Sequence, residues 1–215
     1  MRAIDWYTWE REVGFPMLKR GAVFLSMWHG NLINQLVGVF QGKGSDWSHA
    51  GVYIGWGKVA EATYPRGRII DLRHYMSKEH TLEIYNPPWW SEMERAKVAS
   101  EAARIAYRPY DTWKFARHLI DNIFERITWD AEKQQGMRPL SRLMLDRDKD
   151  KRNVCSELVG RAVAYGTGER IVEGELGTAR PWDIYTWLVN KNASPTFRHS
   201  HGKVEHSLKD GIRYV

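Results

Sequence analysis

Residues 47–63 have the sequence WSHAGVYIGWGKVAEAT, in which two runs of small, β-branched and aromatic residues flank Gly55-Trp56-Gly57. Such runs on either side of a short glycine-rich loop are typical of a β-hairpin. We therefore expect two antiparallel strands here. His49 lies in the first strand and Glu61 in the second.

The length of the hairpin loop determines whether these two polar residues meet. A three-residue loop would pair Ile54 with Lys58 and place Gly51 opposite Glu61, so His49 and Glu61 would share one face as diagonal neighbours. A two-residue loop would place them on opposite faces, because a shift of one residue reverses every side chain. The glycines favour the longer loop. Gly51, on the face of His49, would leave room for a helix end to approach.

Similar patterns outside the hairpin predict an α+β fold with a mainly antiparallel sheet. Ser91 begins a helix through a capping box with Glu94. The predicted segments are strands at 22–27, 68–72 and 81–85, a helix from Ser91 onward, and helices at 155–165 and 182–189.

The length of 215 residues fits one domain, 1–215. Residues 138–152 combine a net positive charge with a short apolar anchor, lie just before the only cysteine, and are expected to border a cleft there. The histidine- and lysine-containing residues after 190 are expected to form a short solvated tail.

The composition excludes several kinds of site. A single cysteine allows neither an intrachain disulfide nor a multi-cysteine metal site. His199, His201 and His206 have no acidic or cysteine partner at ligand spacing, so we expect no metal. No apolar run approaches the ~18 residues of a membrane span, and the first residues lack the apolar core of a signal peptide. We therefore expect a protein that is cytoplasmic as synthesised.

The net charge of +6 and the eleven tryptophans allow several partners. The charge permits attraction to nucleic acid, anionic lipid or anionic wall polymer. The tryptophans fit stacking on sugars, bases or lipid headgroups, and equally the filling of a core.

Cys155 is predicted to begin a helix, where unpaired backbone N–H groups and the helix dipole favour a thiolate. The alternative is a buried structural thiol, since free cysteine is among the most buried residue types. A nucleophilic cysteine needs a base and a group that orients the base, and His49 and Glu61 could supply them. Their alternatives are a strand histidine satisfied by the backbone and a solvent-facing glutamate.

The segments WSHAGVYIG and CSELV, a glutamate twelve residues after the histidine, and the pair Tyr110-Asp111 together resemble the circularly permuted NlpC-type papain-like proteins. This branch includes bacterial cysteine hydrolases and poxvirus relatives and is related to lecithin:retinol acyltransferase-like enzymes. The resemblance covers roughly residues 21–185. The early strand departs from it, because it begins Gly21-Ala22 where the family often has Gly-Asp. The gap between Tyr110-Asp111 and Cys155 is also longer than in compact relatives, so residues 114–150 are expected to form a helical insertion.

The resemblance implies a permuted papain-like fold in which Cys155 is the nucleophile, His49 the general base and Glu61 the residue that orients His49. It implies that Tyr110 and Asp111 line the cleft, although Asp111 could instead cap a helix. Trp47, expected on the same strand face as His49, would form a substrate wall or pack in the core.

We accordingly expect a thiol hydrolase that cleaves an amide, without a cofactor. Its substrate would be a peptide or acyl-amide, derived from peptidoglycan or from lipid, and the protein could be phage-encoded and virion-associated. The alternatives are a lipid-directed acyltransferase or esterase of the same fold, and a non-catalytic virion, wall- or nucleic-acid-binding module. The presence of Cys155, His49 and Glu61 together argues against the non-catalytic alternative and against nucleic acid as a partner.

Overall fold

The computed structural model describes residues 17–30, 47–77, 79–112, 154–172 and 179–200, and the backbone alone of 203–208 and 211–214. The strands are β1 (Val23–Trp28), β2 (His49–Gly55), β3 (Lys58–Glu61), β4 (Arg68–Asp71), β5 (His80–Tyr85), β6 (Pro195–Ser200), β7 (Lys203–Leu208) and β8 (Gly211–Tyr214). The helices are the 3₁₀ turn η2 (Leu72–Tyr75), α3 (Glu92–Ile105), α6 (Cys155–Thr167) and α7 (Pro181–Asn190).

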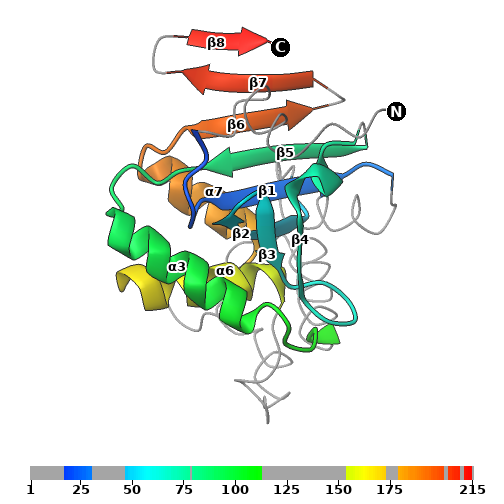
Figure 1. The fold of residues 1–215 in the computed structure, drawn as a ribbon, viewed down its shortest axis with the longest axis vertical. Helices are drawn as coiled ribbons and strands as arrows, with labels where there is room; N and C mark the ends of the chain where they lie inside the picture. Colours follow the sequence, from blue (N-terminus) through cyan, green and yellow to red (C-terminus); the bar gives the residue numbers. More distant parts are fainter. Residues whose placement is uncertain are drawn as a thin grey trace, which may run out of the picture.

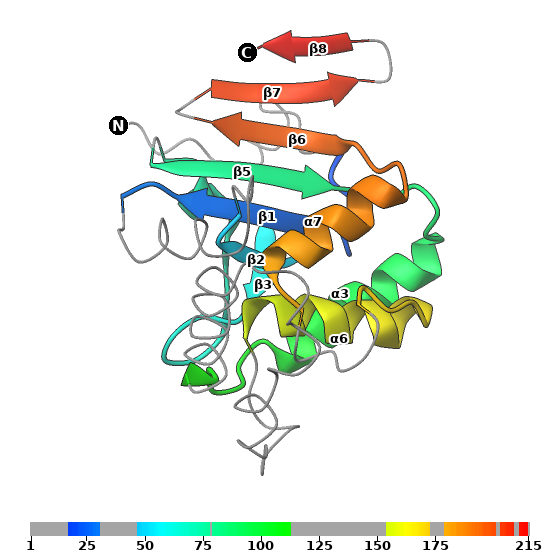
Figure 2. The same ribbon diagram turned by 180° about the vertical axis from the view of Figure 1, so that it is seen from behind.

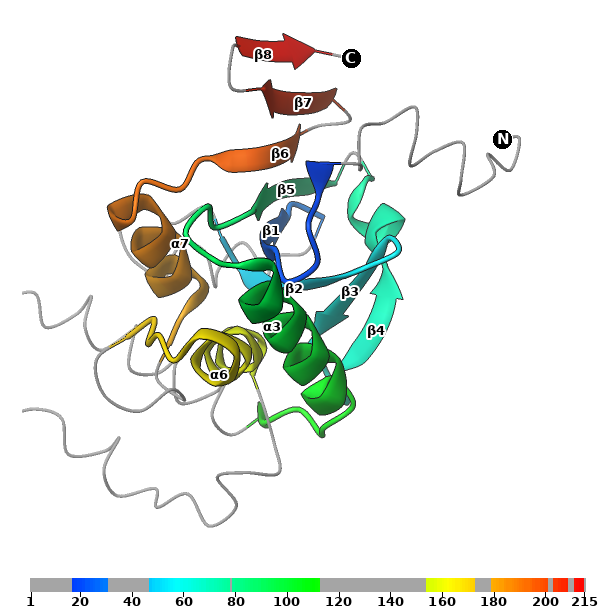
Figure 3. The same cartoon turned by 60° about the vertical axis from the view of Figure 1, so that its left-hand side comes forward.

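The strands form one antiparallel sheet in the order β4-β3-β2-β1-β5-β6-β7-β8 (Figure 1). The helices α3, α6 and α7 lie against one face of this sheet, as the view from behind and the side view show (Figures 2 and 3). The predicted α+β class is therefore confirmed. Within the described ranges, no helix is long and apolar enough to cross a membrane.

The hairpin of β2 and β3 differs in detail from the expected one. Gly55 pairs with Lys58 around a two-residue turn, and a register shift between Tyr53 and Gly55 accommodates an extra residue in β2. The predicted three-residue loop and the pairing of Ile54 with Lys58 are therefore wrong. The bulge restores the register, because it offsets the shorter loop by one residue. Gly51 accordingly lies opposite Glu61, as predicted.

Local chemistry explains the helix termini. Ser91 caps α3 through the predicted capping box: the Glu94 N–H donates to Ser91 Oγ at 3.2 Å, and Glu94 Oε2 accepts from the Ser91 N–H at 2.7 Å. The helix α6 ends at Gly168, whose φ of 75° is readily available to glycine. A Cβ on Gly166 would lie 2.4 Å from Val98 Cγ2, so this glycine lets α6 pack closely against α3.

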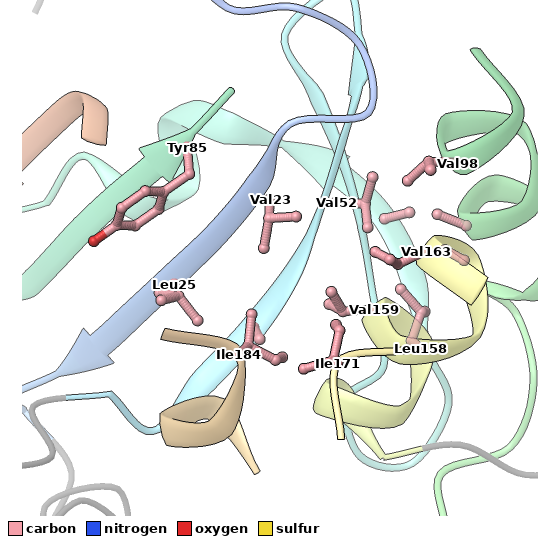
Figure 4. Packing of buried hydrophobic residues seen from close by; sticks show 14 of the residues in the cluster. Val23, Leu25, Val52, Tyr85, Val98, Leu158, Val159, Val163, Ile171 and Ile184 are labelled. Carbon is pink, nitrogen blue, oxygen red and sulfur yellow. The ribbon is translucent and has the colours of Figure 1, made fainter. Parts of the chain in front are cut away.

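Alternate residues of the strands supply two apolar clusters on opposite faces of the sheet. Val23, Leu25 and Val52 face α3, α6 and α7 and pack with Leu158 and Ile184 (Figure 4). On the other face, residues of the central strands pack with Leu18 and with η2. The buried members of this second cluster are Leu18, Ala22, Phe24, Tyr53, Val59, Leu72, Tyr75, Leu82, Ile84 and Phe197.

The chain after α7 corrects the expectation of a solvated tail, because β6, β7 and β8 extend the sheet beyond β5. Phe197 and His199 in β6 are both buried. The predicted insertion at 114–150 and its basic part at 138–152 lie outside the described residues, as does the helix that Asp111 would cap.

Candidate active site

The amino terminus of α6 positions Cys155. Val154 has extended backbone angles and precedes the first helical residue, Cys155, and its carbonyl accepts from the Leu158 N–H at 3.0 Å. The hydroxyl of Ser156 donates to the carbonyl of Ala179 and so ties this terminus to the segment before α7. Cys155 is therefore placed where unpaired helix N–H groups point outward.

The hairpin brings a base to the thiol. His49 Nε2 lies 2.8 Å from Glu61 Oε2, and the thiol of Cys155 is hydrogen-bonded to the His49 ring. Since an ionised carboxylate only accepts hydrogen bonds, Nε2 carries a proton and donates it to Glu61. Nδ1 is then the ring nitrogen left for Cys155. The three residues that the sequence singles out for catalysis are thus in contact.

Backbone N–H groups surround the sulfur. β3 ends at Glu61, opposite Gly51, so it does not extend beside Ala50. The Ala50 N–H instead bonds the Cys155 sulfur, as does the Ser156 N–H of α6. The sulfur lies where strand pairing stops and a helix begins, and both features supply donors to an anion.

The pKa values of the pair are displaced in opposite directions. Burial by itself would lower the pKa of His49, but hydrogen bonds to Cys155 and Glu61 and the charges of both raise it to about 10. Burial by itself would raise the pKa of Cys155, but the hydrogen bond and charge of His49 and the two backbone N–H groups lower it. The pair therefore favours a thiolate and an imidazolium at neutral pH.

Exposure of the two groups is limited. Cys155 is 8% exposed and the side chain of His49 is 22% exposed. Cys155 is thus buried, as in the alternative of a structural thiol, but its bond to His49 distinguishes it from an inert one.

Glu61 is fully buried, which contradicts the alternative of a solvent-facing glutamate. Burial would raise its pKa, but bonds from His49, Tyr75 and Arg68 and the His49 charge lower it to about 2. The Arg68 Nε–H donates to Oε1 at 2.7 Å, and the Tyr75 hydroxyl donates to Oε2. Neither donor is predicted by the sequence pattern.

These donors come from elements whose placement depends on long-range pairing. Arg68 lies opposite Glu61 in the ladder of β3 and β4, whereas Tyr75 lies in η2. A strand signal at 68–72 indicates β4, but the pattern of the intervening residues does not fix its register against β3. Arg68 could therefore not be placed beside Glu61 from the sequence, because that needs the register of β4 against β3.

The resemblance places Tyr110 and Asp111 in the cleft, and the structure describes them by charge and by burial. Burial raises the pKa of Tyr110, and the nearby charges of Cys155 and Asp111 raise it further. The Tyr110 hydroxyl therefore lies within electrostatic range of the sulfur and keeps its proton at neutral pH. Asp111 is buried.

Two expectations about the hairpin face are corrected. Trp47 precedes β2, is buried in the cluster that faces the helices, and packs against Tyr185 with ring centroids 6.2 Å apart. It packs in the core rather than forming a wall on the face of His49. A Cβ on Gly51 would lie 2.3 Å from the Phe24 ring, so this glycine makes room for Phe24 and not for a helix end.

Metal ligands are not grouped in the described part of the chain, where no cluster of three or more histidine, cysteine, aspartate or glutamate side chains has a geometry that could hold a metal ion. Of the three tail histidines, only the His199 side chain lies within that part.

Comparison with known proteins gives no family: no protein-family model matches the chain, and no curated protein matches it either. The functional assignment therefore depends on the residues of the site.

Proposed function

We propose that this protein is a thiol hydrolase of permuted papain-like fold that cleaves an amide through an acyl-thioester on Cys155. The contact of Cys155 with His49, which Glu61 bonds in turn, carries the proposal, because a nucleophile, a base and an orienting carboxylate are the parts that such chemistry needs. His49 also precedes Cys155 in the chain, as in the permuted branch of the papain-like proteins.

Each step can be assigned to a group in the site. The Cys155 thiolate attacks the carbonyl carbon, and the C=O electron pair moves to oxygen. As the carbonyl re-forms, the C–N bond breaks and the His49 imidazolium gives its Nδ1 proton to the leaving amine. Neutral His49 then takes a proton from water, which attacks the thioester and breaks the C–S bond.

The surroundings of the pair support these roles. The opposite pKa displacements favour a preformed ion pair over a neutral thiol that needs deprotonation during attack. The Cys155 N–H at the start of α6 is a natural donor to the oxyanion. Tyr110, which keeps its proton near the sulfur, would line the cleft. The mechanism needs no metal or organic cofactor.

The substrate class that we propose is a peptide or acyl-amide, including fragments of peptidoglycan. A lipid-directed acyltransferase or esterase would use the same pair and differ only in the bond attacked and in the acceptor of the acyl group. A non-catalytic module would not need the acidic thiol.

A thiol-reactive acyl probe tests the proposal. We expect covalent labelling of the wild type, none of Cys155→Ala, and strongly reduced labelling of His49→Ala. A panel of peptide amides, peptidoglycan fragments and fatty-acyl esters, analysed by mass spectrometry with and without an amine acceptor, then separates the hydrolase from the acyltransferase. Equal labelling of wild type and Cys155→Ala would overturn the proposal.

A further inference from the structure

The carboxylate of Glu61 accepts hydrogen bonds from three structural elements. Oε2 accepts hydrogen bonds from His49 Nε2 of β2, at 2.8 Å, and from the Tyr75 hydroxyl of η2. Oε1 accepts one from Arg68 Nε of β4, at 2.7 Å. Because Glu61 is fully buried, it stays ionised only through such donors. All the strong constraints on its orientation therefore come from these three side chains.

Tyr75 contacts the histidine as well as the glutamate. Its ring is nearly parallel to that of His49, with centroids 6.2 Å apart, and Phe24 packs against both rings. Burial and the Glu61 charge raise the pKa of Tyr75, so its hydroxyl stays a donor. Tyr75 thus restrains His49 through its ring and Glu61 through its hydroxyl.

A second network of the same composition lies on β5 and β6. There the buried carboxylate of Glu83 accepts from the Tyr85 hydroxyl at 2.5 Å and from Arg198 Nε at 2.6 Å. Among the described residues, no histidine donates a hydrogen bond to Glu83. The described residues therefore include two tyrosine–glutamate–arginine networks, and the network of Glu61 also holds a histidine bonded to a thiol.

We propose that Tyr75 and Arg68 are positioning residues that act through Glu61 on His49. Tyr75 fixes the oxygen that receives the Nε2 proton, and Arg68 holds the other oxygen and keeps the carboxylate ionised. Together they hold the His49 ring with Nδ1 toward the sulfur. This inference depends on the proposed function only in taking Cys155 and His49 as the reactive pair.

The two residues have separable effects. Tyr75→Phe removes one hydrogen bond but keeps the ring beside His49, so the carboxylate can rotate while its charge remains paired with Arg68. Arg68→Met removes the charge, whereas Arg68→Lys keeps it without the fixed geometry of the guanidinium. Since a hydrogen bond to a charged group is worth roughly a factor of ten or more, we expect about tenfold effects on the thiolate.

The positioning role can be tested without a known substrate. The measurement is the rate of alkylation of Cys155 by iodoacetamide in the full chain, from about pH 4 to pH 9. The wild type should react well below the pKa of an ordinary thiol, near 8.5. Tyr75→Phe and Arg68→Met should move the midpoint of the profile upward and slow alkylation at pH 6 about tenfold, and Arg68→Lys should recover part of the loss. The matched controls are Tyr85→Phe and Arg198→Met, which break the equivalent bonds of Glu83.

The controls separate positioning from stability. They should lower the melting temperature about as much as the site variants and leave the alkylation profile unchanged. Histidine nitrogen shifts report the same difference, because the His49 imidazolium should lose its proton at a lower pH in Tyr75→Phe and Arg68→Met than in the wild type, and at an unchanged pH in the Glu83 controls. If Tyr75→Phe does not fold, Arg68→Met decides the result, since that side chain is 46% exposed.

The possible failures are distinguishable. A wild-type profile like that of a free cysteine would overturn both the proposed function and this inference. An acidic wild-type thiol with unchanged profiles in Tyr75→Phe and Arg68→Met, or with equal shifts in the Glu83 controls, would overturn the positioning role and leave the proposed function standing.

Discussion

Gly51 lies directly opposite Glu61 in the ladder of β2 and β3, and this pairing depends on one extra residue in β2. A regular ladder from the Gly55–Lys58 pair would place Val52 opposite Glu61. The shift at Ile54 moves the pairing by one residue and puts Glu61 on the face of His49. The bulge therefore determines which side chains can form the site.

Gly51→Ala tests how tightly this part of the hairpin is packed. The added methyl would lie 2.3 Å from the Phe24 ring and 2.7 Å from the Ala60 carbonyl. We expect overpacking to lower the free energy of unfolding by about 1–3 kcal/mol, measured by urea denaturation. Combining it with Phe24→Leu should recover part of the loss, and strictly additive effects would contradict the assigned contact.

His49→Gln should make Cys155 a weaker acid, because the thiolate loses a hydrogen bond and a cation. We expect alkylation at pH 6 to slow about a hundredfold, as the thiol returns toward its ordinary pKa. His74→Gln, at an exposed histidine beside Tyr75, is the control and should alkylate as the wild type does. Rapid alkylation of His49→Gln at pH 6 would show that the helix terminus alone accounts for the acidity.

Glu61→Gln should change the response of stability to acid. The pKa of Glu61 is lowered from 4.5 to about 2 in the folded chain, so its contribution to stability is present above pH 4.5 and is lost as the pH falls toward 2. The part of the free energy of unfolding that depends on ionisation of Glu61 amounts to about 3 kcal/mol. Melting temperatures from pH 7 to pH 2 should show the wild type losing its advantage over Glu61→Gln in that window. A constant difference would contradict the lowered pKa.

Ser91→Ala should remove the side-chain cap of α3 and lower the free energy of unfolding by about 1 kcal/mol. Ser100→Ala, at an exposed position within the same helix, should be neutral or slightly stabilising. Chemical denaturation of both variants measures the difference, and similar losses would argue against the capping box.

Trp56→Asn should stabilise the hairpin. Trp56 is 82% exposed and has a φ of 49°, and with Gly57 at 64° it forms a turn that favours asparagine followed by glycine. We expect a gain of about 1 kcal/mol in the free energy of unfolding. Tyr107→Asn, at an exposed position with negative φ, should show no gain; an equal gain there would mean that replacing an exposed aromatic ring with an amide is stabilising in itself, independent of the turn.

Local patterns in the sequence were sufficient for many elements. The capping box of Ser91 and Glu94, the glycine that ends α6 and the alternation in β2 involve residues a few positions apart, whose preferences act without the rest of the fold. The thiol at a helix terminus and the histidine–glutamate pair followed from the same short-range reasoning. The hairpin register was right, although the bulge and not the predicted loop produced it.

Tertiary structure decided the features that depend on distant pairing. The residues after 190 have few apolar side chains, and they form strands because β5 offers an edge on which Phe197 and His199 become buried. Trp47 lies in the core because the helices cover that face of the sheet. Arg68 and Tyr75 reach Glu61 only after β4 and η2 fold back across β3, so the charge and orientation of Glu61 are set by contacts that no local pattern encodes.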